Sequence, residues 1–183
     1  MNSLQGQLLV AHPRLTGGPF SRSVVLITED HAHGSVGLIL NKPTDFSLRQ
    51  IMQSKGYECL QDRMVYLGGP VNSSALIMIH SDTWYSTNTM TVSPGVAISS
   101  DTLMIEKVAM GDYPRDWRFV CGISGWSKGQ LRAEIDGSGP YASRGPSWLT
   151  CSAEPDLIHR WDGEKQWHKA LELCSQEMMN QYF

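Results

Sequence analysis

Short runs of hydrophobic and β-branched residues dominate the first part of the chain. Such runs occupy residues 7–11, 24–28 and 36–40, each with the length and composition of a β-strand. The connections between them contain Pro13, Gly17-Gly18-Pro19 and residues 30–34, which favour turns. Because these connections are too short for the crossover that a parallel pair needs, we expect the sheet to begin with antiparallel strands.

Strand-like and helical patterns then alternate. Further strands are predicted at residues 64–67, 75–79, 95–98 and 118–123. Ser47 and Gln50 form a Ser-x-x-Gln capping arrangement, so a short helix to about Gln53 is expected. Residues 101–110 and 127–136 are also predicted helices, and each is followed by glycine that ends it.

The last helix has the clearest periodicity. It begins near Glu164, after Asp162 in the position of an N-cap. Apolar residues then recur at offsets of three and four, namely Trp167, Ala170, Leu171, Cys174 and Met178. This stripe is expected to pack on the core.

Strands that arrive in clusters between single helices favour an α+β fold over regular alternation around a parallel sheet. The 183 residues show no linker or repeat, so one domain spanning residues 1–183 is predicted. The four cysteines form no C-x-x-C pair, which favours free buried thiols. No segment resembles a signal peptide or a membrane span, so we expect a cytoplasmic protein without membrane contact.

The charge pattern argues against direct nucleic-acid binding. The net charge is −3, and no basic residue occurs between Arg63 and Lys107. Neutralising phosphates requires clustered cations, whereas the cations here are dispersed. No direct nucleic-acid binding is therefore expected.

Motifs for catalysis and metal binding are incomplete. The segment Gly122-Ile123-Ser124-Gly125-Trp126 lies between a predicted strand and a predicted helix, as a nucleophile elbow does. Its last position, however, is a tryptophan where the elbow needs a small residue. His31 and His33 could bind a metal only if a distant ligand such as His80 joined them. We assign no catalytic residue, no metal site and no cofactor.

Two further features have both a structural and a functional interpretation. Gly68-Gly69-Pro70 could present backbone amides to an anion, but no Lys-Ser or Lys-Thr follows, and a tight turn explains it equally well. Trp126, Trp148 and Trp167 could stack on a ligand or face a partner, but packing is the simpler expectation.

Three blocks of the chain resemble the bacterial AlgH/YqgE family. The first contains Gly6, Leu8-Leu9, Ala11, Pro13, Phe20, Arg22-Ser23-Val24-Val25, Gly34, Gly37-Leu38-Ile39, Asn41 and Pro43. The second contains Tyr66, Gly68-Gly69-Pro70-Val71 and His80. The third contains Gly125-Trp126, Gly129-Gln130-Leu131 and Glu134, followed by Trp148-Leu149 and Trp167. Because the blocks occur in the family's order and at compatible spacings, the resemblance covers nearly the whole chain.

The resemblance implies one α+β domain, in which a mixed or antiparallel bifurcated sheet folds into a barrel-like core with helices packed around it. It implies little about activity, because members of the family are only labelled transcriptional regulators or uncharacterised proteins, and no catalytic residues are established for them. Ala75 stands where the family usually has an arginine, and Asp30 where it tends to have a loop histidine. A site that used those two side chains would be altered here.

Two hypotheses from different functional classes follow. The first is a non-enzymatic regulatory or interaction module that binds a protein partner or small ligand and influences gene expression indirectly. The second is a small-ligand-binding protein or an enzyme with a polar pocket near the Gly-Gly-Pro segment. In either case the expected binding residues, which we predict to converge in space, are Arg22, Asn41, Gly69, Trp126 and Gln130. The sequence leaves the partner, the ligand and the oligomeric state open.

Overall fold

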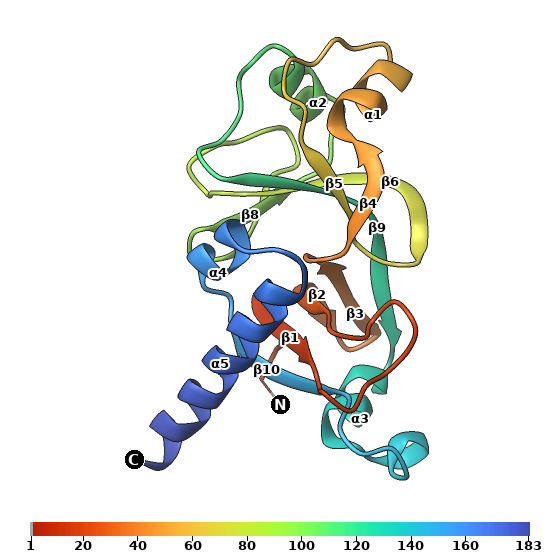
Figure 1. Ribbon diagram of the computed structural model, residues 1–183, viewed down its shortest axis with the longest axis vertical. Coiled ribbons are helices and arrows are strands. Elements are labelled where there is room, and N and C mark those ends of the chain that lie inside the picture. The colour runs from red at the N-terminus through yellow and green to blue at the C-terminus, as the bar shows by residue number, and fades with distance from the viewer. Residues whose placement is uncertain (1) are drawn as a thin grey trace.

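The computed structural model describes residues 2–183, in which ten strands form one curled sheet (Figure 1). The strands are β1 (Gln7–Ala11), β2 (Val24–His31), β3 (Gly34–Ile39), β4 (Pro43–Ser47), β5 (Met64–Leu67), β6 (Val71–His80), β7 (Met90–Ser93), β8 (Val96–Ser99), β9 (Trp117–Ser127) and β10 (Trp148–Ser152). Their order is β10-β1-β2-β3-β9-β6-β8-β7. Off this path, β5 pairs with β9 in parallel, and β4 pairs with β5 in antiparallel orientation. The remaining pairs are antiparallel, so the predicted mixed sheet is confirmed.

The curled sheet forms a half-barrel, and the helices lie around it. They are α1 (Leu48–Ser54), α2 (Thr102–Ala109), α3 (Gln130–Asp136), α4 (Pro155–Arg160), α5 (Gly163–Tyr182) and the 3₁₀ helix η1 (Gly139–Tyr141). The predicted capping box is present at α1, where the Ser47 hydroxyl accepts a hydrogen bond from the Gln50 amide and the Gln50 side chain accepts one from the Ser47 amide. α2 is capped by Asp101, which accepts from the Met104 amide.

The long strand β9 makes the sheet bifurcate. Its second half pairs with β3, whereas its first half pairs with β5 and β6. Gly122 at the change has a φ of +80°, and a Cβ there would lie 2.4 Å from the Gly69 carbonyl oxygen. A Cβ at Gly69 would lie 2.1 Å from the Ile123 carbonyl oxygen, so the two backbones cross too closely for any side chain. The sheet can therefore divide at this point only with glycine at both positions; we call this point the fork of the sheet.

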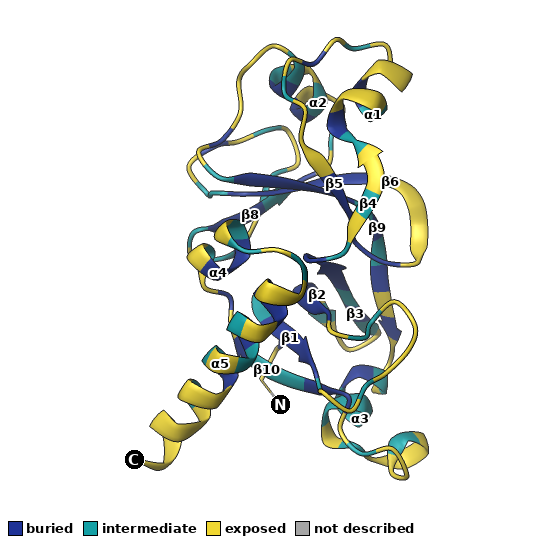
Figure 2. Cartoon of the chain, in the orientation of Figure 1, coloured by how far each residue is buried: buried dark blue, intermediate teal, exposed yellow. Residues whose placement is uncertain are grey.

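Two hydrophobic cores lie on either side of this sheet. The larger core is centred on β1, β2, β3 and β10 with one face of α5, and one face of β5, β6 and β9 also contributes to it. The second core is Leu48, Met52, Cys59, Val65, Leu76, Met78, Trp84, Met104, Val108, Trp117 and Phe119. All of its members come from residues 43–121, which we call the smaller lobe and which carries α1 and α2 (Figure 1). α5 buries one face as far as Cys174, and its C-terminal end extends into solvent (Figure 2).

Some sequence predictions need correction. The strand predicted at residues 118–123 continues to Ser127, because its extension pairs with β3, and α3 begins at Gln130 rather than residue 127. β4, β7, β10 and α4 were not predicted. The strands among them are only four or five residues long, and pairing with neighbours stabilises them more than their own composition does. Asp162 is the N-cap of α5, but its carboxylate makes no capping bond and accepts from the Tyr66 hydroxyl instead.

Candidate functional site

Arg22 and Asn41 meet at the start of α5. The buried Asn41 side chain accepts a hydrogen bond from the Val24 amide at 2.9 Å and donates to the carbonyls of Arg22 and Gly163, also at 2.9 Å. The Arg22 guanidinium forms an ion pair with Glu164, with 2.5 Å between nitrogen and oxygen. These contacts tie the loop before β2 to the first turn of α5.

Trp126 and Gln130 instead meet at Glu134 of α3. The indole nitrogens of Trp126 and Trp148 donate to one carboxylate oxygen at 3.1 and 2.8 Å. The amide nitrogen of Gln130 donates to the other oxygen at 3.0 Å, and its oxygen accepts from the Ser127 amide. The Glu134 carboxylate thus joins the end of β9, α3 and the start of β10.

The five predicted binding residues therefore divide between different places. Among residues 2–183 no hydrogen bond joins the Arg22–Asn41 group to the Trp126–Gln130 group, and α3 lies apart from the start of α5 (Figure 1). Gly69 lies at the fork of the sheet, where its role is close backbone contact. Each group has a structural role, and binding at these residues stays a prediction.

Sequence reasoning missed a buried arginine beside the first group. Arg118 donates to the carbonyls of Leu40 and Trp161 at 2.8 and 2.7 Å and to the Gln166 side chain at 3.2 Å. Its guanidinium also lies 4.5 Å from the centre of the Tyr66 ring. Burial, together with the hydrogen bond to Asp162, raises the pKa of Tyr66 to about 12. This network anchors the turn between α4 and α5, and no signal in the sequence distinguishes Arg118 from an exposed strand residue.

The candidate catalytic and metal-binding side chains have structural partners. The Ser124 hydroxyl is buried and donates to the Gly68 carbonyl at 3.1 Å, and β9 continues through it without the turn that an elbow needs. His80 is buried between the Ser81 carbonyl and the Ser99 hydroxyl. Within the described residues no three His, Cys, Asp or Glu side chains are grouped to hold a metal ion. The geometry therefore supports neither chemistry.

Exposed hydrophobic side chains are unevenly distributed. Among residues 2–183 the large exposed ones are Phe46, Leu60, Met64, Val71, Tyr85, Leu103, Met110 and Tyr113 of the smaller lobe and Met178, Met179, Tyr182 and Phe183 of α5. The strands β1, β2, β3 and β10 contribute none of them. Single exposed hydrophobic residues are ordinary on a protein surface, and most of the large ones among residues 2–183 belong to the smaller lobe.

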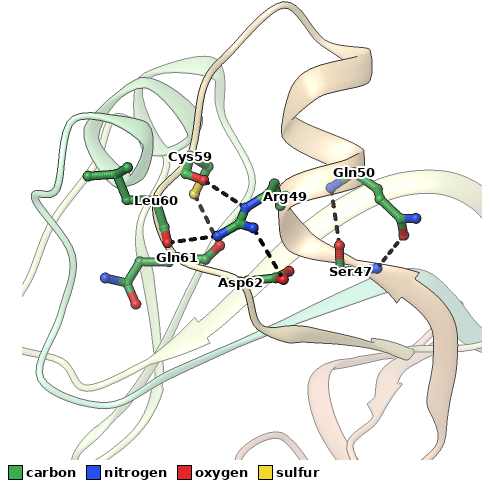
Figure 3. A network of polar contacts seen from close by, with 7 residues as sticks. All are labelled: Ser47, Arg49, Gln50, Cys59, Leu60, Gln61 and Asp62. Carbon is green, nitrogen blue, oxygen red and sulfur yellow. Dashed lines mark hydrogen bonds and ion pairs between the residues drawn. The ribbon is translucent and has the colours of Figure 1, made fainter.

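Leu60 is the most exposed of these residues in the smaller lobe, at 91%. It lies on a loop that Arg49 of α1 holds from behind: the guanidinium donates to the carbonyls of Cys59 and Leu60 at 3.4 and 3.3 Å and lies 3.6 Å from the Asp62 carboxylate (Figure 3). The capping box fixes the turn of α1 that carries Arg49 (Figure 3). The Leu60 side chain points away from all these contacts (Figure 3).

The neighbouring Gln61 connects this loop to Tyr113. Its amide donates to the Tyr113 hydroxyl at 3.3 Å, and Tyr113 is 39% exposed. The centre of the Tyr113 ring lies 5.5 Å from that of Trp117, and the Arg63 guanidinium lies 3.8 Å from the centre of the Trp117 ring. We call Leu60, Gln61 and Tyr113 the Leu60 surface. No periodic pattern in the sequence marks it, because a single leucine in a polar loop has no spacing signal.

No helix among the described residues combines the length and the hydrophobicity needed to cross a bilayer.

Comparison with known proteins gives a consistent result. Residues 8–179 match the AlgH-like family. A UPF0301 protein of Methylococcus capsulatus is 34% identical over 91% of this chain and 88% of its own length, and one of Stenotrophomonas maltophilia is 32% identical over 92% and 87%. The solution structure of AlgH from Pseudomonas aeruginosa superposes with a TM-score of 0.76 at 24% identity, covering 93% of this chain and 88% of AlgH. The α+β fold is the same, and the chain belongs to the AlgH-like family.

Proposed function

We propose that this protein is a non-enzymatic interaction module that binds a protein partner through the smaller lobe, with Leu60 at the centre of the contact. The observation that carries the proposal is Leu60 itself, a leucine 91% exposed on a loop held by three contacts from Arg49. A side chain on an ordered loop loses less conformational entropy on binding than one on a mobile loop.

The energetics favour such a contact. Burying one exposed leucine in a partner's apolar pocket contributes about 1.5–3 kcal/mol. Tyr113 offers an aromatic ring with a hydroxyl at its edge, a combination that is enriched at protein interfaces. The partner that fits this surface has an apolar pocket with polar groups around it. An effect on gene expression would then be indirect, through that partner.

A position-specific crosslink tests the proposal. Leu60 is replaced in living cells by the photoreactive residue benzoylphenylalanine, and Arg14, which is exposed outside the smaller lobe, is replaced in the control. We expect one discrete adduct from position 60 and none of the same mass from position 14. The captured protein, once purified, should bind the Leu60→Ser variant about tenfold more weakly than the parent chain.

Two results would contradict the proposal. One is the same adduct pattern from both positions. The other is unchanged affinity for Leu60→Ser, since this fully exposed substitution leaves both cores intact. The Arg49→Ala variant gives a second measurement: it frees the loop but keeps the leucine, so it should weaken binding less than Leu60→Ser does.

A further inference from the structure

A groove of about 600 Å³ lies beside α1, and none of its lining residues belongs to the Leu60 surface. It is bounded by α1, β4, the end of β5, the first part of β6 and the middle of β9. Its apolar lining consists of Phe46, Ile51, Leu67, Leu76 and Cys121. Sites for small molecules have this size and a mostly hydrophobic lining with a few polar groups.

The groove exists because β6 leaves the sheet. Val71 of β6 pairs with Ile123 of β9, whereas Leu76 pairs with Cys121, so β6 contains three more residues than β9 over this stretch. Asn72 in the excess segment has a φ of +50°, and Figure 1 shows this part of β6 curving outward. The bulge uncovers Cys121, which is half-buried, while the other three cysteines are buried.

The lining also has a distinct charge. Lys55, at the end of α1, is the one charged residue among the eleven that line the groove, and no carboxylate lies among them. Lys55 forms no salt bridge within residues 2–183. Burial raises the pKa of the Cys121 thiol, and the positive charge of Lys55, which lines the same groove, opposes that shift.

We propose that this groove binds a small organic anion with an apolar body, such as a medium-chain carboxylate. The body lies against Ile51, Leu67 and Leu76, and the head group lies at Lys55. Hydrophobic burial supplies most of the binding free energy, whereas the single uncompensated cation selects the charge of the ligand. This site is separate from the protein contact proposed above, and neither proposal depends on the other.

Decanoate is a suitable probe. Decan-1-ol, which has the same apolar body without the charge, and acetate, which has the charge without the apolar body, are matched controls. Calorimetry measures affinity, and alkylation of Cys121 by N-ethylmaleimide, followed by peptide mass spectrometry, reports the position. Cys59, Cys151 and Cys174 are buried and serve as internal references. We expect decanoate to slow alkylation of Cys121 selectively, decan-1-ol to do so more weakly, and acetate to have no effect.

Two lysine variants test the role of charge. Lys55→Gln should weaken decanoate binding about three- to fivefold at low salt, the range for a partly exposed ion pair, and leave decan-1-ol binding unchanged. Lys128→Gln, at an exposed lysine outside the groove lining, should leave both unchanged. The proposal is overturned if decanoate leaves the alkylation rate of Cys121 unaltered, if decan-1-ol binds as tightly as decanoate, or if both variants behave alike.

Discussion

His159 is a half-buried histidine whose two ring nitrogens are shielded from solvent and have no hydrogen-bond partner among the described residues. Burial lowers its pKa from 6.5 to about 4, and the charges of Arg118 and His80 add to the shift while Asp116 and Asp156 oppose it. The unfolded chain therefore binds this proton more readily than the folded one. The contribution of His159 to the unfolding free energy is therefore fully present above about pH 6.5 and is lost as the pH falls toward 4.

Replacing this histidine should reduce the pH dependence of folding. The parent chain is expected to lose about 2 kcal/mol of unfolding free energy through His159 between pH 7.5 and pH 5. The His159→Leu variant, which breaks no hydrogen bond, should no longer show this loss. A smaller pH dependence of the unfolding free energy should persist because burial also lowers the pKa of His80. Urea unfolding at both pH values measures the difference. His168→Gln, at an exposed histidine, is the control, and equal slopes for His159→Leu and the parent would refute the assignment.

At the scale of elements, α5 has two parts with different roles. Trp167 and Ala170 in its first half are buried, and the Trp167 indole donates to the Ala11 carbonyl at 2.9 Å. In its second half Met178 and Met179 are about half exposed, at 49% and 57%. The periodic stripe predicted along the whole helix is therefore core in its first half and surface at its end.

This division predicts effects of very different size from two changes in α5. Trp167→Ala should lower the unfolding free energy by about 3–5 kcal/mol, because it leaves a cavity and a carbonyl without its donor. Removing residues 179–183, all exposed, should change it by less than about 0.5 kcal/mol. Thermal or urea unfolding of both variants measures this. A large loss from the truncation would show that the end of α5 contributes to the fold.

For the whole molecule, the arrangement of cations supports weak binding to nucleic acid. Of the 15 Lys and Arg residues, seven form ion pairs with carboxylates within residues 2–183. Arg118 is buried, and the Lys42 ammonium donates to the Ser21 carbonyl. Few cations are left to neutralise phosphates together.

Titration of a generic DNA duplex at physiological salt should accordingly give a dissociation constant above about 1 μM. Fluorescence anisotropy at several salt concentrations measures both the affinity and its salt slope. Submicromolar affinity that falls steeply with added salt would instead identify a direct DNA-binding protein, whose basic surface assembles only in the folded molecule or its oligomer.

Local signals predicted much of the fold. The β-branched runs of β1, β2 and β3, the Ser47–Gln50 capping box and the periodicity of α5 each depend on residues close together in the chain. The same signals missed β4, whose partner β5 is separated from it by α1, and β7, which is only four residues long and forms a hairpin with the next strand, β8. The candidate site was harder to predict, since Leu60 matters through its loop's attachment to Arg49, eleven residues away.

The sequence by itself determined the α+β class, the positions of the main strands and helices, and the family resemblance, because each depends on local pattern or on motif order. Only the tertiary structure decided that Arg22 and Asn41 lie in one group and Trp126 and Gln130 in another. It also decided that Cys121 lies beneath a groove beside Lys55. These relations join residues far apart in the chain, and the register of β6 against β9, which positions the groove, leaves no trace in either strand alone.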